Sequence, residues 1–215
     1  MNIRLNQVVP IPLKDKLMQR HSDIWNSDVL FTKGDRVKIK APSGTGKTTL
    51  VHIIYKMRGD YSGTLCYDQA DLRNIKADTL SNFRQQNISV IFQDMRLFTN
   101  LTARENIELK RVMTKPMYDE QMIDTMAGRL GITHILNQTV ATCSYGEQQR
   151  IAIIRSLMQP FEWLIMDEPF SHLDEDNTAK AAALIDEECK KRGAGFILTD
   201  LDEDTNFEYS RRMIL

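Results

Sequence analysis

The stretch that decides the fold reads Ala41-Pro42-Ser43-Gly44-Thr45-Gly46-Lys47-Thr48-Thr49. It follows a β-like run at residues 36–40 and leads into an apolar segment, residues 50–57, that suits a helix. A strand, a glycine-rich loop, a Lys-Thr pair and a helix in this order predict a phosphate-binding P-loop. Gly44 and Gly46 let backbone N–H groups approach phosphate oxygens, and the helix that follows presents its positive end to an anion.

The residues of this loop have predicted roles. Lys47 places a positive charge where the β- and γ-phosphates of a nucleotide lie, and the Thr48 hydroxyl can ligate Mg²⁺. We therefore predict that the nucleotide is bound by Ala41, Pro42, Ser43, Gly44, Thr45, Gly46, Lys47, Thr48 and Thr49. Ala41 stands where the pattern has glycine, and alanine is acceptable there only if its φ stays below zero. The alternative interpretation is a Gly/Ser/Thr-rich turn before a core helix.

Length and composition indicate an ordinary globular protein. The chain has 215 residues, of which 42% are apolar and 27% charged, and its net charge is −1, which gives no indication of a nucleic-acid partner. No run approaches the roughly 18 apolar residues of a membrane span, and the first residues show no signal peptide. Cys66, Cys143 and Cys189 are odd in number and far apart, which suits a reducing compartment. We therefore expect a cytosolic chain that reaches a membrane only through a partner.

Turn and periodicity signals predict an α/β domain with a helical insertion. Residues 8–13 suit an edge or irregular strand because prolines interrupt them, and residues 29–31 and 37–39 suit a hairpin around Lys33-Gly34-Asp35. Further predicted elements are strands at 64–67, 88–92, 163–166 and 196–199, a partial helix at 71–87 and a helix at 179–192 closed by Gly193. Residues 101–160 carry Met, Leu and Ile at helical spacing and predict an inserted helical lobe.

A second pattern supports the P-loop. The apolar strand at residues 163–166 ends in Asp167-Glu168-Pro169. Asp167 can hold Mg²⁺, and Glu168 can orient and deprotonate an attacking water. Gln93, at the end of another buried strand, could reach the same metal and water, although a strand cap is the alternative. We therefore predict Glu168, Lys47 and Gln93 as catalytic residues, and Thr48, Gln93 and Asp167 as metal ligands.

A third pattern marks a helix start at residues 143–150, Cys-Ser-Tyr-Gly-Glu-Gln-Gln-Arg. Ser144 suits an N-cap, and Glu147 three residues later completes a capping box. One interpretation is a capped helix and nothing more. The functional interpretation is an anion site, because a Ser hydroxyl and a Gly amide at a helix N-terminus attract phosphate.

In their order along the chain, these patterns resemble the nucleotide-binding domain of ABC ATPases. The matching segments are the P-loop at 41–49, the Q-loop Ile91-Phe92-Gln93-Asp94, the signature-like Ser144-Tyr145-Gly146-Glu147-Gln148-Gln149-Arg150, the Walker B end Asp167-Glu168-Pro169 and the D-loop-like Ser171-His172-Leu173-Asp174. The resemblance spans about residues 20–205. Within the family, residues 92–98 and 101–106 look most like the lipoprotein-release and cell-division branch.

The resemblance implies an α/β fold, with a P-loop NTPase core, an N-terminal antiparallel β subdomain and an inserted α-helical signature subdomain. Residues 1–215 would form a single ATP-binding domain. Its RecA-like core would comprise about residues 1–93 and 161–215, and its helical subdomain about residues 94–160.

The resemblance also implies ligands and partners. ATP and Mg²⁺ would be the cofactors, and two such domains, identical or different, would pair head to tail. Ser144, Gly146 and Glu147 would then bind the nucleotide held by the partner's P-loop, and Ser171 and Asp174 would cross the interface. A transmembrane subunit would dock on the helical lobe.

Several residues depart from the family pattern. Besides Ala41, Tyr145 and Glu147 add bulk and negative charge beside the implied phosphate site. Asp200 stands where the family has a switch histidine, and its side chain should point away because an aspartate repels phosphate. An aromatic residue for adenine is not evident, since Met18 stands at the expected place, while Trp25 is either the alternative or a core residue. We therefore expect retained ATP binding and slow turnover.

Two other hypotheses remain beside the ATPase subunit of a membrane transporter. One is a degenerate module that binds nucleotide and acts as a scaffold. The other is a soluble ABC ATPase that acts on DNA, ribosomes or Fe–S assembly, although the first two types usually need long coiled-coil insertions or tandem domains. An acidic run at residues 200–204 suits a solvated loop.

Overall fold

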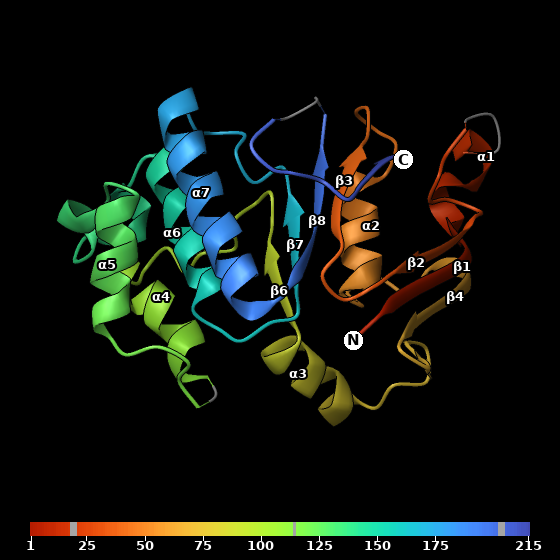
Figure 1. Cartoon of the computed structure of the whole chain (residues 1–215), viewed down its shortest axis with the longest axis horizontal. Helices are drawn as coiled ribbons and strands as arrows, with labels where there is room; N and C mark the ends of the chain where they lie inside the picture. The colour runs from red at the N-terminus through yellow and green to blue at the C-terminus, as the bar shows by residue number, and fades with distance from the viewer. Residues whose placement is uncertain (18–20, 114, 202–204) are drawn as a thin grey trace.

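The computed structural model of the chain describes residues 1–17, 21–113, 115–201 and 205–215. Its elements are β1 (Ile3–Pro10), a 3₁₀ turn η1 (Ile11–Leu13), α1 (Lys14–Leu17), β2 (Asp28–Phe31), β3 (Arg36–Lys40), α2 (Lys47–Ile54), β4 (Tyr61–Tyr67), β5 (Ala70–Asp71), α3 (Ala77–Gln86), β6 (Ile88–Ile91), α4 (Ala103–Val112), α5 (Gln121–Arg129), η2 (Thr133–Ile135), η3 (Val140–Thr142), α6 (Tyr145–Leu157), β7 (Trp163–Asp167), α7 (Glu175–Arg192), β8 (Gly195–Asp200) and β9 (Arg211–Ile214). They form two sheets and a group of helices (Figure 1).

The N-terminal part of the chain supplies an antiparallel sheet of order β2-β1-β4-β5. The prediction of an edge or irregular strand at residues 8–13 is confirmed for Val9 and Pro10, which pair with β4 alone, because β2 pairs with β1 only over Ile3–Asn6. The predicted irregularity is confirmed by a register shift between Asn6 and Val9. Pro10 is tolerated because it ends the strand, and residues 11–13 continue as a 3₁₀ turn.

The predicted hairpin around Lys33-Gly34-Asp35 is wrong. β2 pairs with β1 in the antiparallel sheet, whereas β3 pairs with β8 and β9 in the other sheet. Gly34 has a φ of 92°, so the turn itself exists as the sequence indicates. A turn signal gives the local bend of the backbone but not the sheet to which each flanking strand belongs.

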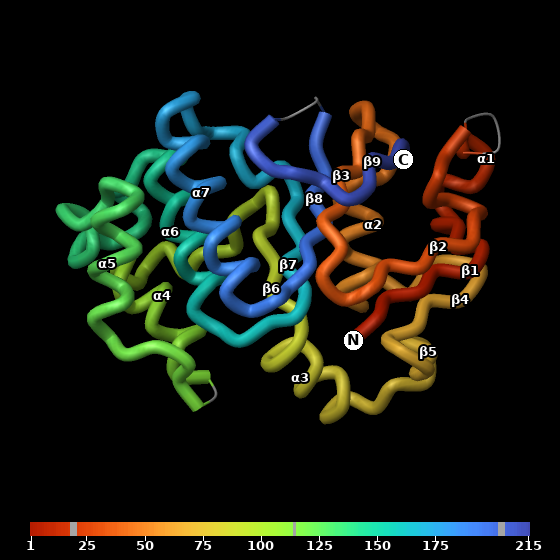
Figure 2. The backbone as a smooth tube through the Cα atoms, in the orientation of Figure 1, coloured from red at the N-terminus to blue at the C-terminus, as the bar shows by residue number. Residues whose placement is uncertain are grey.

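The second sheet has the order β6-β7-β8-β3-β9, and its strands pair in parallel. Every residue of β7 is buried, as expected for a parallel strand that is covered on both faces. The prediction of strands at 88–92, 163–166 and 196–199 is confirmed by β6, β7 and β8. The C-terminal strand β9, which the sequence analysis missed, lies beside β3 (Figure 2).

Helices cover the parallel sheet from both sides. α2 contacts β7, whereas α6 contacts β6 and packs against α7, with α4 and α5 beyond them (Figure 1). The helix predicted at 179–192 ends as expected at Gly193, whose φ is 57°, but it begins earlier, at Glu175. Helices α4, α5 and α6 all fall between β6 and β7, inside the interval 94–160 predicted for the helical subdomain. The subdomain boundaries themselves stay a prediction.

Two buried clusters hold these layers together. One joins the helical group to the parallel sheet and includes Ile107, Ile153 and Leu164. The other fills the space between the two sheets and includes Leu5 and Ile39. The sheet edge on which the P-loop lies is therefore backed by packed apolar side chains, which provide a rigid base for a site.

Candidate nucleotide-binding site

The register of the parallel sheet brings three predicted motifs to one edge. Lys40 of β3, the last residue before the loop, is opposite Asp200 of β8, and Asp167 of β7 is opposite Thr199 of β8. Ile91 of β6 is opposite Met166. The segments that follow these strands emerge together because the carboxyl ends of parallel strands share an edge, which is where such sheets bind ligands.

The loop after β3 has the backbone that a P-loop requires. Gly44 and Gly46 have φ of 76° and 101°, a left-handed region in which side chains are strained. Ala41 does not adopt a positive φ, so alanine is tolerated at this position. A Cβ at Gly46 would lie 3.0 Å from Leu13 Cδ1, so any side chain there would also force Leu13 to shift. Trp25 holds the loop from behind, because its indole N–H donates to the Thr45 carbonyl at 3.1 Å.

Three side chains predicted to be catalytic lie in contact. The Lys47 ammonium donates to the Ala41 carbonyl at 2.9 Å and lies 3.2 Å from Glu168 Oε1. Gln93 Nε2 donates to Glu168 Oε2 at 3.0 Å. Glu168 has a φ of 47°, an unusual value for a non-glycine residue and one that marks functional sites. Both carboxylate oxygens of Glu168 thus face groups that the sequence singled out.

A cleft of about 320 Å³ joins these residues to the loop, and it is lined by Leu13, Ser43, Gly44, Gly46, Lys47, Thr48, Thr49, Gln93 and Glu168. Ala41 and Thr45 are buried and form the frame of the loop rather than the lining of the cleft. The Thr45 hydroxyl donates to the Pro42 carbonyl at 2.7 Å, which fixes the bend of the loop. The nucleotide and metal roles of all these residues remain predictions.

One carboxylate oxygen of Asp167 lacks a hydrogen-bond partner among the described residues, as expected for a metal ligand. Asp167 is 1% exposed, and its Oδ1 accepts a hydrogen bond from the Thr199 hydroxyl at 2.8 Å. Its Oδ2 is buried and finds no hydrogen-bond partner among the described residues. An orphaned carboxylate oxygen is costly unless a ligand satisfies it. A hard cation that prefers oxygen ligands, such as Mg²⁺, is a ligand of the kind that would satisfy this atom.

The signature-like residues lie elsewhere, at the N-terminus of α6. The predicted capping box is confirmed, since Glu147 N–H donates to Ser144 Oγ at 3.3 Å while Glu147 Oε2 accepts from Ser144 N–H at 2.8 Å. Ser144 Oγ also donates to Glu147 Oε2 at 2.8 Å. Hydrogen bonds from the Ser144 backbone and hydroxyl hold the pKa of Glu147 below its usual range. Ser144, Gly146 and Glu147 do not line the cleft of their own chain.

Two further features surround this helix start. The ring of Tyr145 is 68% exposed and stacks on His172, with centroids 5.4 Å apart. A Cβ at Gly146 would lie 2.9 Å from the His172 carbonyl oxygen, so only glycine fits there. Asp174 caps α7 by accepting a hydrogen bond from Asn177 N–H at 2.8 Å. This bond is the main reason that the pKa of Asp174 is lowered. The signature segment and the D-loop segment therefore lie against each other within one chain.

Asp200 points away from the cleft, as the sequence analysis expected. Its Oδ2 lies 3.7 Å from the ammonium of Lys38, which is 1% exposed, and its Oδ1 accepts from Leu201 N–H at 2.7 Å. The backbone carbonyl of Asp200 accepts from Ala41 N–H at 2.9 Å, which ties β8 to the P-loop. Asp200 is not among the residues that line the cleft.

The cleft also contains a residue that no sequence pattern indicated. Leu13 lines the cleft beside Gly46, and no sequence signal distinguishes it from its apolar neighbours. Trp25 is 3% exposed and belongs to the core, in line with one of its two interpretations. Met18 and the acidic residues 202–204 lie outside the described residues.

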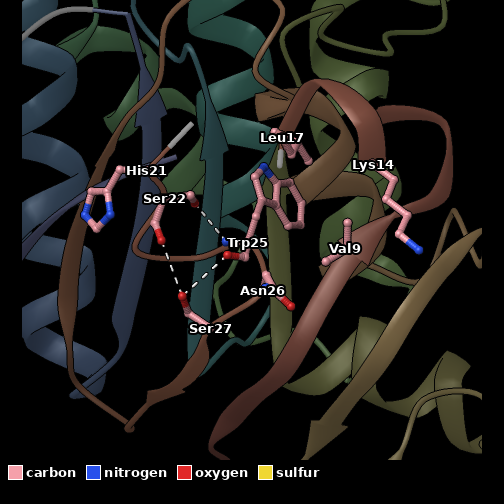
Figure 3. A pocket seen from close by; sticks show the side chains of 8 residues that line it. All are labelled: Val9, Lys14, Leu17, His21, Ser22, Trp25, Asn26 and Ser27. Atoms are coloured by element: carbon pink, nitrogen blue, oxygen red, sulfur yellow. Dashed lines mark hydrogen bonds between the residues drawn. The ribbon is translucent and has the colours of Figure 1, made fainter. Parts of the chain in front are cut away.

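Trp25 also lines a second cavity of about 350 Å³, together with Lys14, Leu17, His21 and neighbouring residues (Figure 3). The backbone N–H of Trp25 donates to Ser22 Oγ at 2.8 Å, which fixes the indole between this cavity and the P-loop.

The fold and the cleft together define the class of P-loop nucleotide hydrolases, in which a loop lysine, a strand-end carboxylate pair and a polar side chain meet around phosphate. Among the described residues, no helix is both long and apolar enough to cross a membrane.

Comparison with known proteins narrows this class to a family. The family profile described as ABC transporter matches residues 25–171. The lipoprotein-releasing system ATP-binding protein LolD of Idiomarina loihiensis is 29% identical over 177 residues, which cover 81% of this chain and 78% of that protein. LolD of Shewanella frigidimarina is 28% identical over 190 residues, 87% of this chain and 80% of that protein.

The dimeric structure of MJ0796, a bacterial ABC transporter cassette, matches with a TM-score of 0.77 and 26% identity over 93% of this chain and 88% of that chain. The chain therefore belongs to the ABC transporter family, and it is an ATPase of that family's type. The resemblance to this family read from the sequence is confirmed in these matches, and the LolD relatives lend some support to the lipoprotein-release branch.

Proposed function

We propose that this chain is the ATP-binding and ATP-hydrolysing subunit of a membrane transporter. The observation that carries the proposal is the convergence of Lys47, Glu168 and Gln93 on one P-loop cleft. The family match and the LolD relatives support the same assignment. As one domain with a core at about 1–93 and 161–215 and a helical subdomain at about 94–160, the chain works at the cytoplasmic face through a transmembrane partner.

The residues of the cleft have different roles in ATP hydrolysis. Backbone N–H groups of the loop and the Lys47 ammonium bind the phosphates of ATP and stabilise the charge that develops on the γ-phosphoryl group. Phosphate competes with Glu168 for Lys47, which frees this carboxylate to accept a proton from the attacking water. Gln93 holds the other carboxylate oxygen and so orients the base.

Thr48 and Asp167 would hold a divalent cation, with the orphaned Asp167 Oδ2 as one of its ligands. When bound, Mg²⁺ would neutralise negative charge on the phosphates. Asp167 itself is held in place by the Thr199 hydroxyl, so the ligand is oriented before the cation arrives.

Dimerisation completes the site in this proposal. Ser144, Gly146 and Glu147 stand at a helix N-terminus, outside the cleft of their own chain, so they are free to meet nucleotide held by a second domain. The dimeric form of the related cassette supports pairing of two domains, and the head-to-tail orientation is part of the proposal. Because Asp200 is turned toward Lys38, no side chain at that position aligns water in the cleft, and turnover is slow.

The test is steady-state ATP hydrolysis by the purified chain and by Glu168→Gln. We expect the wild type to turn over more slowly than about 1 per second, and the variant to lose a further 10²-fold or more while binding ATP normally, since a general base contributes about 10²–10⁴-fold. Glu187→Gln, which changes an exposed carboxylate on α7, is the matched control. Equal activity of Glu168→Gln and wild type would remove Glu168 from the mechanism.

The competing scaffold hypothesis is favoured by one observation, the engagement of Asp200 by Lys38 instead of the cleft. It predicts tight ATP binding without phosphate release, even with the membrane partner present. Measuring phosphate release in the assembled complex separates the two proposals.

A further inference from the structure

Leu13 and Thr49 form one rim of the P-loop cleft, which both residues line. They flank Gly46, since a Cβ there would lie 3.0 Å from Leu13 Cδ1 and 3.7 Å from Thr49 Cβ. In the proposed function, Lys47 and Glu168 act on the phosphates and on the attacking water, so the nucleoside of ATP lies along another part of the cleft. Among the described residues that line the cleft, Leu13 alone has a hydrocarbon side chain.

An arginine stands at this rim. Arg58 lies in the segment between α2 and β4, its side chain is 34% exposed, and its Nη1 is 3.5 Å from the Thr49 hydroxyl. Arg58 Nε donates to Asp60 Oδ1 at 2.9 Å, and Arg58 Nη2 donates to Asp60 Oδ2. A two-point contact of this kind fixes the plane of the guanidinium group.

The same aspartate ties the arginine to the 3₁₀ turn. The backbone carbonyl of Asp60 accepts a hydrogen bond from Ile11 N–H at 2.9 Å, and the turn that begins at Ile11 ends at Leu13. Asp60 therefore links the position of Leu13 to the orientation of Arg58. Leu13, Thr49 and Arg58 come from three separate segments of the chain and meet at one rim.

The chemistry of this rim suits a flat, uncharged ring. A guanidinium plane stacks on aromatic faces and is attracted to them by the cation–π interaction. The charge of Arg58 is already matched by the Asp60 carboxylate, which would repel a phosphate group brought to the same place. Leu13 adds apolar carbons on which the face of a ring can pack. The base of a nucleotide fits these properties, whereas a phosphate does not.

We propose that Arg58 is a base-binding residue whose guanidinium plane stacks on the purine of ATP at the rim formed by Leu13 and Thr49. This rests on the proposed function, because ATP is taken as the ligand. The sequence shows no evident aromatic residue for adenine, and Trp25 is 3% exposed and bound to the Thr45 carbonyl. A planar cation from the segment after α2 takes the stacking role instead, and Asp60 is its positioning residue.

The test compares ATP with inorganic tripolyphosphate, which has three phosphates and no base. Binding of each to the full chain is measured by isothermal titration calorimetry in EDTA, which prevents turnover. We expect Arg58→Ala to weaken ATP binding about tenfold and to leave tripolyphosphate binding within about twofold of wild type. Arg58→Lys keeps the charge but loses the plane, so it should lose as much ATP affinity as Arg58→Ala.

Arg73→Ala is the matched control. Arg73 also pairs with an aspartate two positions away, Asp71, and lies 3.2 Å from a threonine hydroxyl, that of Thr64. Thr64, unlike Thr49, is not among the residues that line the cleft. We therefore expect Arg73→Ala to bind ATP as tightly as wild type.

A second nucleotide gives an independent readout. The wild type should bind ATP about three- to tenfold more tightly than CTP, because a purine offers a larger face for stacking than a pyrimidine. Arg58→Ala should narrow this preference to less than about twofold. A preference that survives the substitution would assign base selection to other residues and would overturn the proposal.

Four further results would overturn it. They are unchanged ATP binding in Arg58→Ala, a parallel loss of ATP and tripolyphosphate binding, rescue by Arg58→Lys, and an equal loss in Arg73→Ala. The second and third would make Arg58 a phosphate ligand, and the last would trace the loss to a weakened fold. Failure of the proposed function looks different, since the chain would then bind ATP in an Arg58-dependent way without hydrolysing it.

Discussion

The ammonium of Lys47 lies 3.2 Å from the carboxylate of Glu168, and the two side chains are 8% and 12% exposed. The residue predicted to bind phosphate is thus ion-paired with the residue predicted to activate water. Phosphate binding is therefore linked to the release of the Glu168 carboxylate from its ion pair, because both involve the ammonium of Lys47.

Replacing Lys47 with methionine should weaken ATP binding by about 10- to 100-fold, the worth of one charge-assisted contact to phosphate. Equilibrium dialysis with ATP measures this change, and circular dichroism checks that the chain is folded. Lys180→Met serves as the control. An unchanged affinity would place the phosphates outside the cleft.

Gln93→Ala should lower kcat by about tenfold and leave the KM for ATP within twofold. The amide of Gln93 contacts Glu168 Oε2 and not the loop, so its loss frees the base to rotate without removing a phosphate ligand. A large increase in KM would instead show that Gln93 binds nucleotide directly.

Asp200→Asn should leave ATP turnover within twofold of wild type and lower the free energy of unfolding by about 1 kcal/mol. The reason is that the Asp200 carboxylate faces the buried ammonium of Lys38 and not the cleft. Denaturant unfolding and steady-state hydrolysis test the two parts. A tenfold loss of turnover at unchanged stability would contradict this placement.

The capping box of α6 predicts a pH dependence. Hydrogen bonds from Ser144 hold the pKa of Glu147 below its ordinary value of 4.5, so Glu147 stabilises the fold at pH values above that value. This contribution is lost as the pH falls through the folded-state pKa. The unfolding free energies of wild type and Glu147→Ala should differ by about 0.5 kcal/mol at pH 7 and converge near pH 3. A gap that persists at pH 3 would assign the effect to packing.

Leu13→Ala should weaken ATP binding by about three- to tenfold, because the variant removes apolar area from the rim of the cleft beside Gly46. Ile11→Ala is the matched control, since Ile11 is 60% exposed and does not line the cleft. Titration with a fluorescent ATP analogue compares the variants. Equal losses of ATP affinity in the two variants would mean that the effect comes from the 3₁₀ turn and not from contact between Leu13 and the nucleotide.

Much of the site could be predicted because its parts are local. Gly44 and Gly46 specify a loop conformation that few other residues adopt, and the capping box at Ser144 depends on groups within one helical turn. The continuous apolar run at residues 163–166, just before Asp167, predicts a buried strand. Such features need no knowledge of distant segments, so sequence patterns identify them.

The remainder depends on which distant segments pair. Gln93 meets Glu168 only because β6 and β7 lie side by side in register. The failed hairpin around Gly34 has the same origin, since β2 and β3 join different sheets. Leu13 reaches the P-loop from a 3₁₀ turn in another part of the chain, and no local pattern records that approach.

By itself, the sequence determined the phosphate loop, the acidic strand end, the capped signature helix and the family. Tertiary structure alone decided that Asp200 faces Lys38 and that Lys47 is paired with Glu168. The physical reason is that backbone geometry is set by neighbouring residues. Electrostatic partners are instead set by strand register and helix packing between segments far apart in the chain.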